Sequence, residues 1–189
     1  INEHNSKNNN RALLKEFIIK SEKMFGDFLE KHPEVRKKII IQTKCGICNG
    51  YYDSSKEHIL NSVTKSLKNF KTDYIDILLL HRPDTLMEPK EIAEAFNELY
   101  EAKKVKYFGV SNMNPYQMQL IQKYLKFPLV INQLQFSLVH AGMIDSGINA
   151  NMTNAGSIDH DGSILEYCRL NDITIQPWSI LQASWENGC

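Results

Sequence analysis

The chain has 189 residues, in which 22 lysines and arginines balance 22 aspartates and glutamates. This length is enough for one domain with a substantial core, or for part of a larger one, and the balanced charge gives no overall field to attract nucleic acid. No segment reaches the roughly 18 to 20 consecutive apolar residues that span a bilayer, and the start has no signal-peptide pattern, so we predict a soluble protein that binds neither nucleic acid nor membrane.

The N-terminal quarter of the sequence predicts a disordered start, a helix and a strand. The first ten residues are polar and rich in asparagine, and we expect them to be disordered. Residues 11–30 carry apolar side chains at three- and four-residue spacing, which predicts an amphipathic helix. The stretch KKIIIQTK then predicts a short buried strand over about residues 38–43. A helix follows, with Ser54 and Glu57 in a capping-box pattern.

The middle of the chain alternates between strands and helices. The stretch DYIDILLLHRPD, residues 73–84, has apolar residues on nearly consecutive positions, which is typical of a strand covered on both faces in a parallel sheet. A helix with Pro89 in its first turn and the strand VKYFGV come next. Asn114 as N-cap and Pro115 as first helical residue predict another helix, and PLVINQLQ predicts a fourth strand.

The last part of the chain begins with an unusually long connection. Residues 137–162 are rich in Gly, Asn, Asp and Ser, and their number predicts either a functional loop or a mobile one. GSILEYCRLN predicts a short helix, and DITIQPWSIL predicts a fifth strand. Because strands and helices alternate without a dividing linker, we predict one α/β domain over residues 1–189 with a parallel sheet.

The cysteines are too few and too scattered for a disulfide framework in a chain of this length. We therefore expect reduced thiols and a cytoplasmic protein. Two of them form the CxxC pattern CGIC, which also occurs in zinc and thioredoxin-type sites. A single CxxC lacks the second ligand pair of a structural zinc site, so the sequence assigns no metal ligands. The four cysteines are Cys45, Cys48, Cys168 and Cys189.

Polar or aromatic residues stand at the end of every expected strand. In α/β sheets and barrels the carboxyl ends of the parallel strands form the rim where ligands bind. Each residue alone also fits a structural role, such as a solvated strand end for Lys44 or a hydrogen-bonded core histidine for His81. Together they favour a functional site. The set comprises Lys44, His81, Ser111, Asn112, Gln133, Trp178 and Ser179.

The same segments resemble a known family. IIIQTKCG, DYIDILLLHRPD, KVKYFGVSNMNP, INQLQFS and IQPWSIL occur in the order and at about the spacing seen in aldo-keto reductases. The resemblance covers roughly residues 21–181 and is greatest to bacterial oxidoreductases that carry HRPD after the fourth strand. It implies a TIM-type (β/α)8 barrel, with about five of the eight strands represented. It also implies reduction of an aldehyde or ketone to an alcohol by hydride transfer from NADP(H).

The resemblance further implies a cofactor site on the rim. Ser111, Asn112 and Gln133 match the trio that hydrogen-bonds the nicotinamide carboxamide, a role suited to side chains with both donors and acceptors. Trp178 stands where the family stacks an aromatic ring on the nicotinamide, and Ser179 is expected near the cofactor phosphates.

The catalytic residues match the family only in part. Lys44 matches the lysine that lowers the pKa of a neighbouring tyrosine, and His81 matches the histidine that orients the substrate carbonyl. The family's Asp and Tyr come from before the SEKMFG helix, where this chain reads HNSKNNNRALLKEFIIKSE and has neither. Either these residues belong to parts of a larger reductase, or the chain lacks its proton donor. Tyr51 and Tyr52, in the loop after the first expected strand, are a weaker substitute.

Two alternatives to a reductase stay open. One is a module that binds a nicotinamide cofactor without turnover, which the missing tyrosine favours. The other is a different phosphate-binding TIM barrel, in which Ser111, Asn112 and Gln133 are dispensable for nicotinamide binding. Neither the particular carbonyl substrate nor the oligomeric state follows from these residues.

Overall fold

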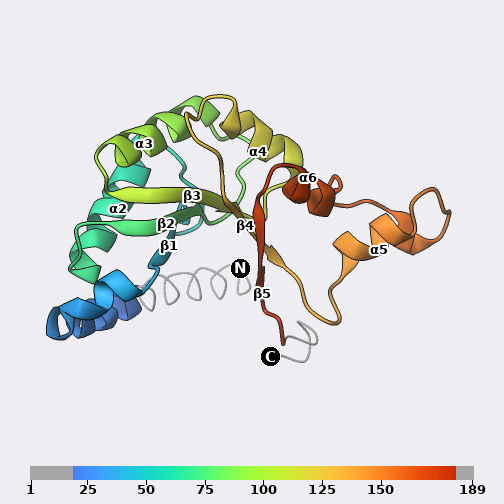
Figure 1. Ribbon diagram of the computed structural model, residues 1–189. Helices are drawn as coiled ribbons and strands as arrows, with labels where there is room; N and C mark the ends of the chain where they lie inside the picture. Colours follow the sequence, from blue (N-terminus) through green and yellow to red (C-terminus); the bar gives the residue numbers. More distant parts are fainter. Residues whose placement is uncertain (1–18, 182–189) are drawn as a thin grey trace, which may run out of the picture.

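The computed structural model describes residues 19–181, which form a curved parallel sheet with helices along its outer side (Figure 1). The sheet order follows the sequence, and every neighbouring pair is parallel. The strands are β1 (Gln42–Cys45), β2 (Ile75–Leu80), β3 (Val105–Ser111), β4 (Ile131–Gln135) and β5 (Thr174–Trp178). This is the architecture of part of a (β/α)8 barrel, and it confirms the predicted fold class.

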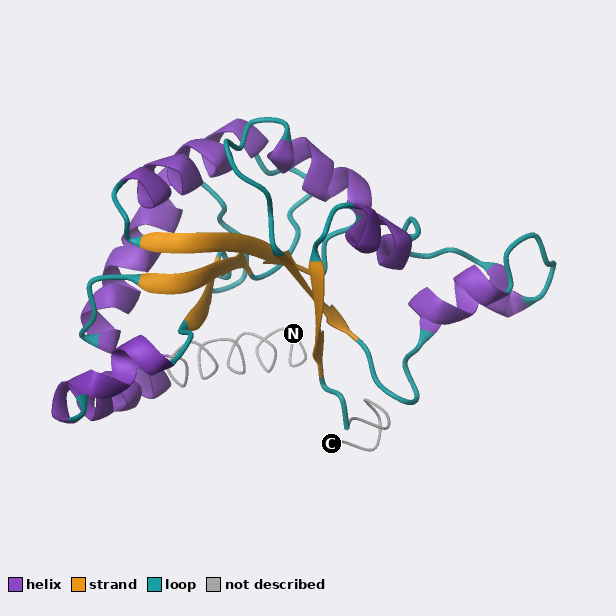
Figure 2. Cartoon of the chain, viewed as in Figure 1, coloured by secondary structure: helices purple, strands orange, loops and turns teal. Residues whose placement is uncertain are grey.

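The helices alternate with the strands and cover the convex face of the sheet (Figure 2). Those between successive strands are α2 (Lys56–Phe70), α3 (Pro89–Glu101), α4 (Pro115–Gln122) and α6 (Ile164–Leu170). A further helix, residues 19–31, precedes β1. None of the helices within the described range is both long and apolar enough to cross a bilayer.

The central strands are buried on both faces, as the apolar run of β2 predicts. Ile75, Leu78 and Leu80 belong to the main core, in which Phe96 of α3 stacks on Phe108 of β3 with ring centres 4.4 Å apart. Gly109 allows β3 and β4 to approach closely, because a Cβ there would lie 2.5 Å from the Ile131 carbonyl oxygen.

Two helix starts show how local sequence fixes the boundaries. Asn114 caps α4, with its Oδ1 accepting from the Gln117 N–H at 2.9 Å, while Gln117 Oε1 accepts from the Asn114 N–H at 3.0 Å. The expected N-cap is thus confirmed. The cap of α2 is Ser55 and not Ser54, because the Ser55 hydroxyl is the one that accepts from the His58 N–H.

The start of β1 differs from the prediction. The strand begins at Gln42 and not near residue 38, and a short 3-10 helix, η1 (Pro33–Lys38), precedes it. The Ile41 N–H is taken by the Asp76 carboxylate at 3.0 Å, and Ile40 is 74% exposed. The strand also ends later than predicted, at Cys45, so Lys44 lies within β1 instead of beyond it. Trp178, likewise expected beyond its strand, is the last residue of β5.

The long connection after β4 is not without secondary structure. It contains α5 (Gly142–Ile148) and a short 3-10 helix, η2 (Ala155–Ser157). None of the α5 residues is buried and its start has no side-chain cap, so the sequence carried little helical signal. The expectation of disorder for the first ten residues lies outside the described residues.

A buried carboxylate attaches the helix of residues 19–31 to the sheet and to α2. Glu22 is only 7% exposed and accepts hydrogen bonds from Thr43 Oγ1 at 2.9 Å, Ser66 Oγ at 2.8 Å and Asn69 Nδ2 at 2.9 Å. These three bonds join the helix to β1 and α2, beside the site described below.

We expect Glu22→Ala to lower the free energy of unfolding by about 1 to 3 kcal/mol, because buried donors lose their acceptor. Urea denaturation of the purified protein measures this change. Glu30→Ala is the matched control on the same helix, since Glu30 is mainly exposed and its one ion pair within residues 19–181 is a surface pair with Lys71. Equal effects of the two substitutions would show that the Glu22 hydrogen bonds do not stabilise the fold.

Candidate functional site

A hydrogen-bond network crosses the inner side of the curved sheet. The Lys44 ammonium donates to Gln133 Oε1, and Gln133 Nε2 donates to Gln176 Oε1 at 2.7 Å. Gln42 Nε2 also donates to Gln176 Oε1 at 2.7 Å. Gln42 and Gln176 come from β1 and β5, the two outermost strands. The sheet therefore curves enough for side chains from its two edges to meet, as inward-facing residues do in a barrel.

A second branch of the network joins the ends of β3 and β5 to the middle of β4. Ser111 Oγ donates to the Gln133 carbonyl oxygen at 3.0 Å, and Asn112 Nδ2 donates to Ser111 Oγ at 2.8 Å. The indole N–H of Trp178 donates to Asn112 Oδ1 at 3.1 Å. The structure thus places four of the predicted cofactor residues together. Ser179, with φ of 56°, follows Trp178 and takes no part in this network among the described residues.

The backbone at Asn112 is in the left-handed region, with φ of 58°. Its N–H still donates to the Gln133 carbonyl oxygen, at 3.0 Å. Asparagine tolerates this conformation better than most residues because its short polar side chain bonds locally. In this turn the side-chain amide of Asn112 accepts from the Trp178 indole N–H, and Asn112 lies in the site, before the start of α4.

The two predicted catalytic residues, Lys44 and His81, line one cavity of about 550 Å³. The His81 N–H donates to the Cys45 carbonyl oxygen at 2.9 Å, which holds the chain just beyond β2 against the end of β1. Arg82 lies in the same wall, and its guanidinium carbon is 5.9 Å from the centre of the Trp178 ring. Next to the His81 imidazole the cavity therefore has the cationic side chains of Lys44 and Arg82, and its wall further along holds His58, Lys23 and Lys65.

Burial and mutual repulsion set the protonation states in this cavity. Burial lowers the pKa of Lys44, and the positive charge of Arg82 lowers it further. Burial, then Lys44 and then Arg82 lower the pKa of His81 to about 4. The His81 imidazole is consequently neutral at physiological pH and has one ring N–H to donate and one ring nitrogen to accept.

The shifted pKa of His81 predicts a loss of stability in weak acid. An unfolded histidine titrates at about 6.5, so between pH 6.5 and about 4 the unfolded state binds the proton that the folded state excludes. The unfolding free energy should therefore fall as the pH is lowered through this range. We expect His81→Gln to reduce the slope, measured by urea denaturation at pH 7 and pH 5. His160→Gln, at an exposed position, should leave the slope unchanged, and equal slopes in all three proteins would contradict the assignment.

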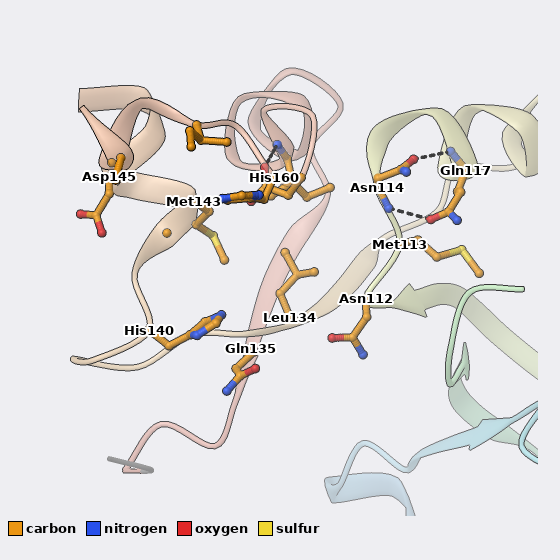
Figure 3. Close-up of a pocket in the computed structure, with 16 residues that line it drawn as sticks. Asn112, Met113, Asn114, Gln117, Leu134, Gln135, His140, Met143, Asp145 and His160 are labelled. Carbon is orange, nitrogen blue, oxygen red and sulfur yellow. Dashed lines mark hydrogen bonds between the residues drawn. The ribbon is translucent and has the colours of Figure 1, made fainter. Parts of the chain in front are cut away.

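A second cavity, of about 720 Å³, lies between the start of α4 and the long connection after β4 (Figure 3). Asn112 is on one side of it, and His140, Met143 and His160 of the connection are on the other. Asn112 thus belongs both to the network and to this cavity. The connection, to which the sequence analysis assigned no specific role, supplies much of the wall.

Three residues of the site were missed by the sequence analysis: Gln42, Gln176 and Arg82. A signal for two of them was present, because alternate residues of a strand share a face. Gln42 stands two residues before Lys44, and Gln176 stands two before Trp178. Of the two loop tyrosines, Tyr52 lines the cavity of Lys44 and His81, whereas Tyr51 is 60% exposed.

Comparison with known proteins agrees with this geometry. The aldo/keto reductase family model matches residues 18–188. The chain is 45% identical over 139 residues to the uncharacterized oxidoreductase YcsN of Bacillus subtilis, covering 68% of this chain and 46% of that protein. It is 37% identical over 137 residues to a 6-dehydroglucose reductase of Agrobacterium fabrum, with 67% and 46% covered.

A solved structure gives the same result for the fold. An aldo-keto reductase from a Medee basin deep-sea metagenome library has a TM-score of 0.65 at 26% identity, covering 85% of this chain and 51% of that one. The chain spans about half the length of the relatives it matches. The matched range contains all five strands and every residue of the network. The chain therefore belongs to the aldo/keto reductase family.

Proposed function

We propose that this chain carries part of the active site of an NADP(H)-dependent oxidoreductase that reduces an aldehyde or ketone to an alcohol. The observation that carries the proposal is the placement of Lys44 and His81 in one cavity, with Lys44 bonded to Gln133 of the cofactor-type trio. The names of two relatives, an oxidoreductase and a 6-dehydroglucose reductase, support the reaction class.

The donors and acceptors of the network fit a nicotinamide. A carboxamide has one carbonyl acceptor and one NH2 donor group, which Ser111, Asn112 and Gln133 can complement. Trp178 is partly exposed and is fixed by its bond to Asn112, so its ring offers a held surface for stacking. In this proposal these residues hold NADP(H), with Ser179 near its phosphates, and the bound cofactor supplies the hydride. The preference for NADP(H) over NAD(H) rests on the family.

Lys44 and His81 then act on the carbonyl oxygen of the substrate. The neutral His81 donates its ring N–H to this oxygen and orients the carbonyl group in the cavity. The Lys44 ammonium stabilises the negative charge that develops on the oxygen as the carbonyl is reduced. The alkoxide left by hydride transfer takes its proton from water or from a phenol held beside Lys44, and the charge of Lys44 lowers the pKa of such a phenol by favouring the phenolate. Arg82 adds to the positive potential of the cavity wall.

The free thiols of Cys45, Cys48 and Cys168 support a reducing, cytoplasmic location as part of the same proposal, because exposure to an oxidising compartment selects for disulfides. The partner of the site is a small molecule. A sugar carbonyl is a reasonable first substrate to test, since one relative is a 6-dehydroglucose reductase.

The test uses the full-length protein and two readouts. NADPH binding is followed through quenching of Trp178 and Trp185 fluorescence, and turnover through loss of NADPH absorbance with a panel of aldehydes, ketones and keto sugars. Saturable binding with turnover is the expected result, and parallel titration with NADH decides the cofactor preference. Binding without turnover would instead support a non-catalytic module. Absence of binding would overturn the proposal.

The variant Asn112→Ala tests whether the network contributes to NADPH binding. It removes the acceptor of the Trp178 indole N–H and should weaken NADPH binding by at least about tenfold, equivalent to 1.4 kcal/mol. Asn154→Ala, in the exposed part of the long connection, is the control and should bind NADPH as the wild type does. Unchanged binding by Asn112→Ala would favour a different phosphate-binding barrel.

A further inference from the structure

Cys48, Asp53 and His58 meet on the side of the Lys44 cavity formed by the β1–α2 connection and the first turn of α2. Each offers one ligand atom, and the three atoms lie within 4.8 Å of one another. Cys48 Sγ is 3.8 Å from His58 Nδ1, which in turn is 3.6 Å from Asp53 Oδ2. The reaction proposed above uses none of these three residues.

The spacing of these atoms is that of a metal-binding group. Zn–S and Zn–N bonds of about 2.3 and 2.1 Å at a tetrahedral angle put sulfur and nitrogen about 3.6 Å apart, and nitrogen and carboxylate oxygen about 3.4 Å apart. The observed 3.8 and 3.6 Å exceed these values by only about 0.2 Å. The third pair, Cys48 and Asp53, lies within 4.8 Å, so side-chain rotation that includes the His58 ring is needed to bring all three atoms onto one ion.

Hydrogen bonds to neighbouring residues leave one ligand atom of the histidine and one of the aspartate available for an ion. Ser62 Oγ lies 3.2 Å from His58 Nε2, one helical turn along α2. With Nε2–H donating to this hydroxyl, Nδ1 is left to accept, and a partner of this kind accompanies most metal-bound histidines. Cys48 Sγ is 3.8 Å from Nδ1 and 3.9 Å from Nε2, so the ring has to rotate to turn the Nδ1 lone pair toward the thiol. The Ser55 N–H donates to Asp53 Oδ1 at 3.0 Å, which leaves Oδ2 for the ion.

Backbone hydrogen bonds within the connection fix its conformation independently of an ion. The Cys48 N–H donates to the Tyr51 carbonyl oxygen, and the Asp53 N–H donates to the Gly46 carbonyl oxygen, each at 2.9 Å. Ile47 and Tyr52 form an antiparallel bridge between these two bonds. The loop therefore closes on itself and presents Cys48 and Asp53 from the same side.

We propose that Cys48, Asp53 and His58 form a binding site for Zn²⁺ or a similar divalent transition metal. A thiolate, an imidazole and a carboxylate together suit zinc, whereas Mg²⁺ and Ca²⁺ prefer oxygen ligands alone. The thiolate and carboxylate carry two negative charges, which balance the ion once Cys48 has released its proton. Cys48 is only 7% exposed, but the Asp53 and His58 side chains are 30% and 23% exposed, so the ion can enter.

The site leaves one of four coordination positions for water or another ligand, the arrangement of open zinc sites. In this site only one cysteine of the CxxC pattern binds the ion, whereas both do so in the usual zinc sites. Cys48 finds its partners five and ten residues further along the chain, and Cys45 is not among them. The second ligand pair that the motif lacks in the sequence is supplied by the loop and by α2.

The experiment adds Zn²⁺ alone to the tag-free, full-length protein in competition with a chromophoric chelator. Co²⁺ is added to a second sample to look for the sulfur-to-cobalt charge-transfer band that reports thiolate ligation. We expect one equivalent to bind and the band to appear. Cys48→Ser, Asp53→Asn and His58→Gln should each weaken Zn²⁺ binding by more than about tenfold, and Ser62→Ala by about tenfold.

Cys168→Ser and His140→Gln are the controls, since both residues lie far along the chain in the α6 and β4–α5 regions, and neither should change binding. If Cys48→Ser does not fold, the variants of the two partly exposed ligands, Asp53→Asn and His58→Gln, still test the proposal. Absence of saturable binding, or binding that survives His58→Gln and Asp53→Asn, would overturn the proposal. Because the readout is metal binding, the result is independent of whether the chain reduces a carbonyl.

Discussion

Replacing Lys44 with methionine is expected to lower kcat/KM for carbonyl reduction by about 10²- to 10⁴-fold in the full-length protein, the range typical of a lost proton-transfer or charge-stabilising group. Methionine keeps an unbranched stem but removes the ammonium that lies in the cavity with His81. NADPH binding should fall much less, because Ser111, Asn112 and Trp178 still hold one another. Steady-state kinetics and fluorescence titration of the same preparation measure the two effects.

Lys65→Met is the matched control for this substitution. Lys65 lines the same cavity but comes from the exposed side of α2, so its loss should leave turnover unchanged. Near-normal reduction by Lys44→Met would remove Lys44 from the mechanism. Equal losses of binding and turnover would mean that Lys44 serves to position Gln133, whose Oε1 accepts its hydrogen bond.

Local patterns in the sequence predicted the alternation of strands and helices, the parallel sheet and several boundaries. The consecutive apolar residues of β2 required cover on both faces, and only a parallel α/β architecture supplies it in this alternation. The pair Asn114 and Pro115 fixed the start of α4, because capping depends on residues within one turn. Both predictions used interactions between near neighbours in the chain.

The predicted start of β1 was wrong because the actual start depends on a contact between residues far apart in the sequence. Ile39, Ile40 and Ile41 have high strand propensity, but the N–H of Ile41 is claimed by the carboxylate of Asp76, 35 residues later. The short helix α5 was missed for the opposite reason. It buries no residue and has no side-chain cap, so neither periodicity nor termini marked it.

In the site, too, some features follow from the local sequence and others depend on contacts between distant residues. The predicted residues of β3, β4 and β5 came together because neighbouring strands are parallel and in sequence order, although Gln133 lies within β4 and not at its end. The bond between Gln42 and Gln176 depends on the curvature of the whole sheet, which sequence spacing does not specify. The group of Cys48, Asp53 and His58 depends on how the β1–α2 loop folds over α2. It therefore had no motif to reveal it.

Asp76→Ala should be among the most destabilising single substitutions in the chain, costing about 3 to 5 kcal/mol, because it leaves the buried guanidinium of Arg36 without its counterion. Asp76 Oδ2 lies 2.8 Å from Arg36 Nη2, with the two side chains 10% and 11% exposed. It also accepts from Lys106 Nζ at 2.9 Å and from the Ile41 N–H at 3.0 Å. Although burial alone would raise the pKa of Asp76, these three donors hold it below its usual value. The stabilisation should thus be lost as the pH falls toward the acid range.

Three further variants separate the contributions of the partners, with urea denaturation as the measurement. Lys106→Met should cost less than about 1 kcal/mol, since its side chain is half exposed. Arg36→Met should cost an intermediate amount, because Asp76 keeps two of its donors. The double substitution Asp76→Ala with Arg36→Met should be less destabilising than the sum of the two single ones, since it removes both buried charges. If the two single changes in unfolding free energy sum to that of the double variant, the ion pair does not account for the loss of stability. Asp76 would then act mainly by accepting from the Ile41 N–H at the start of β1, the strand that places Lys44.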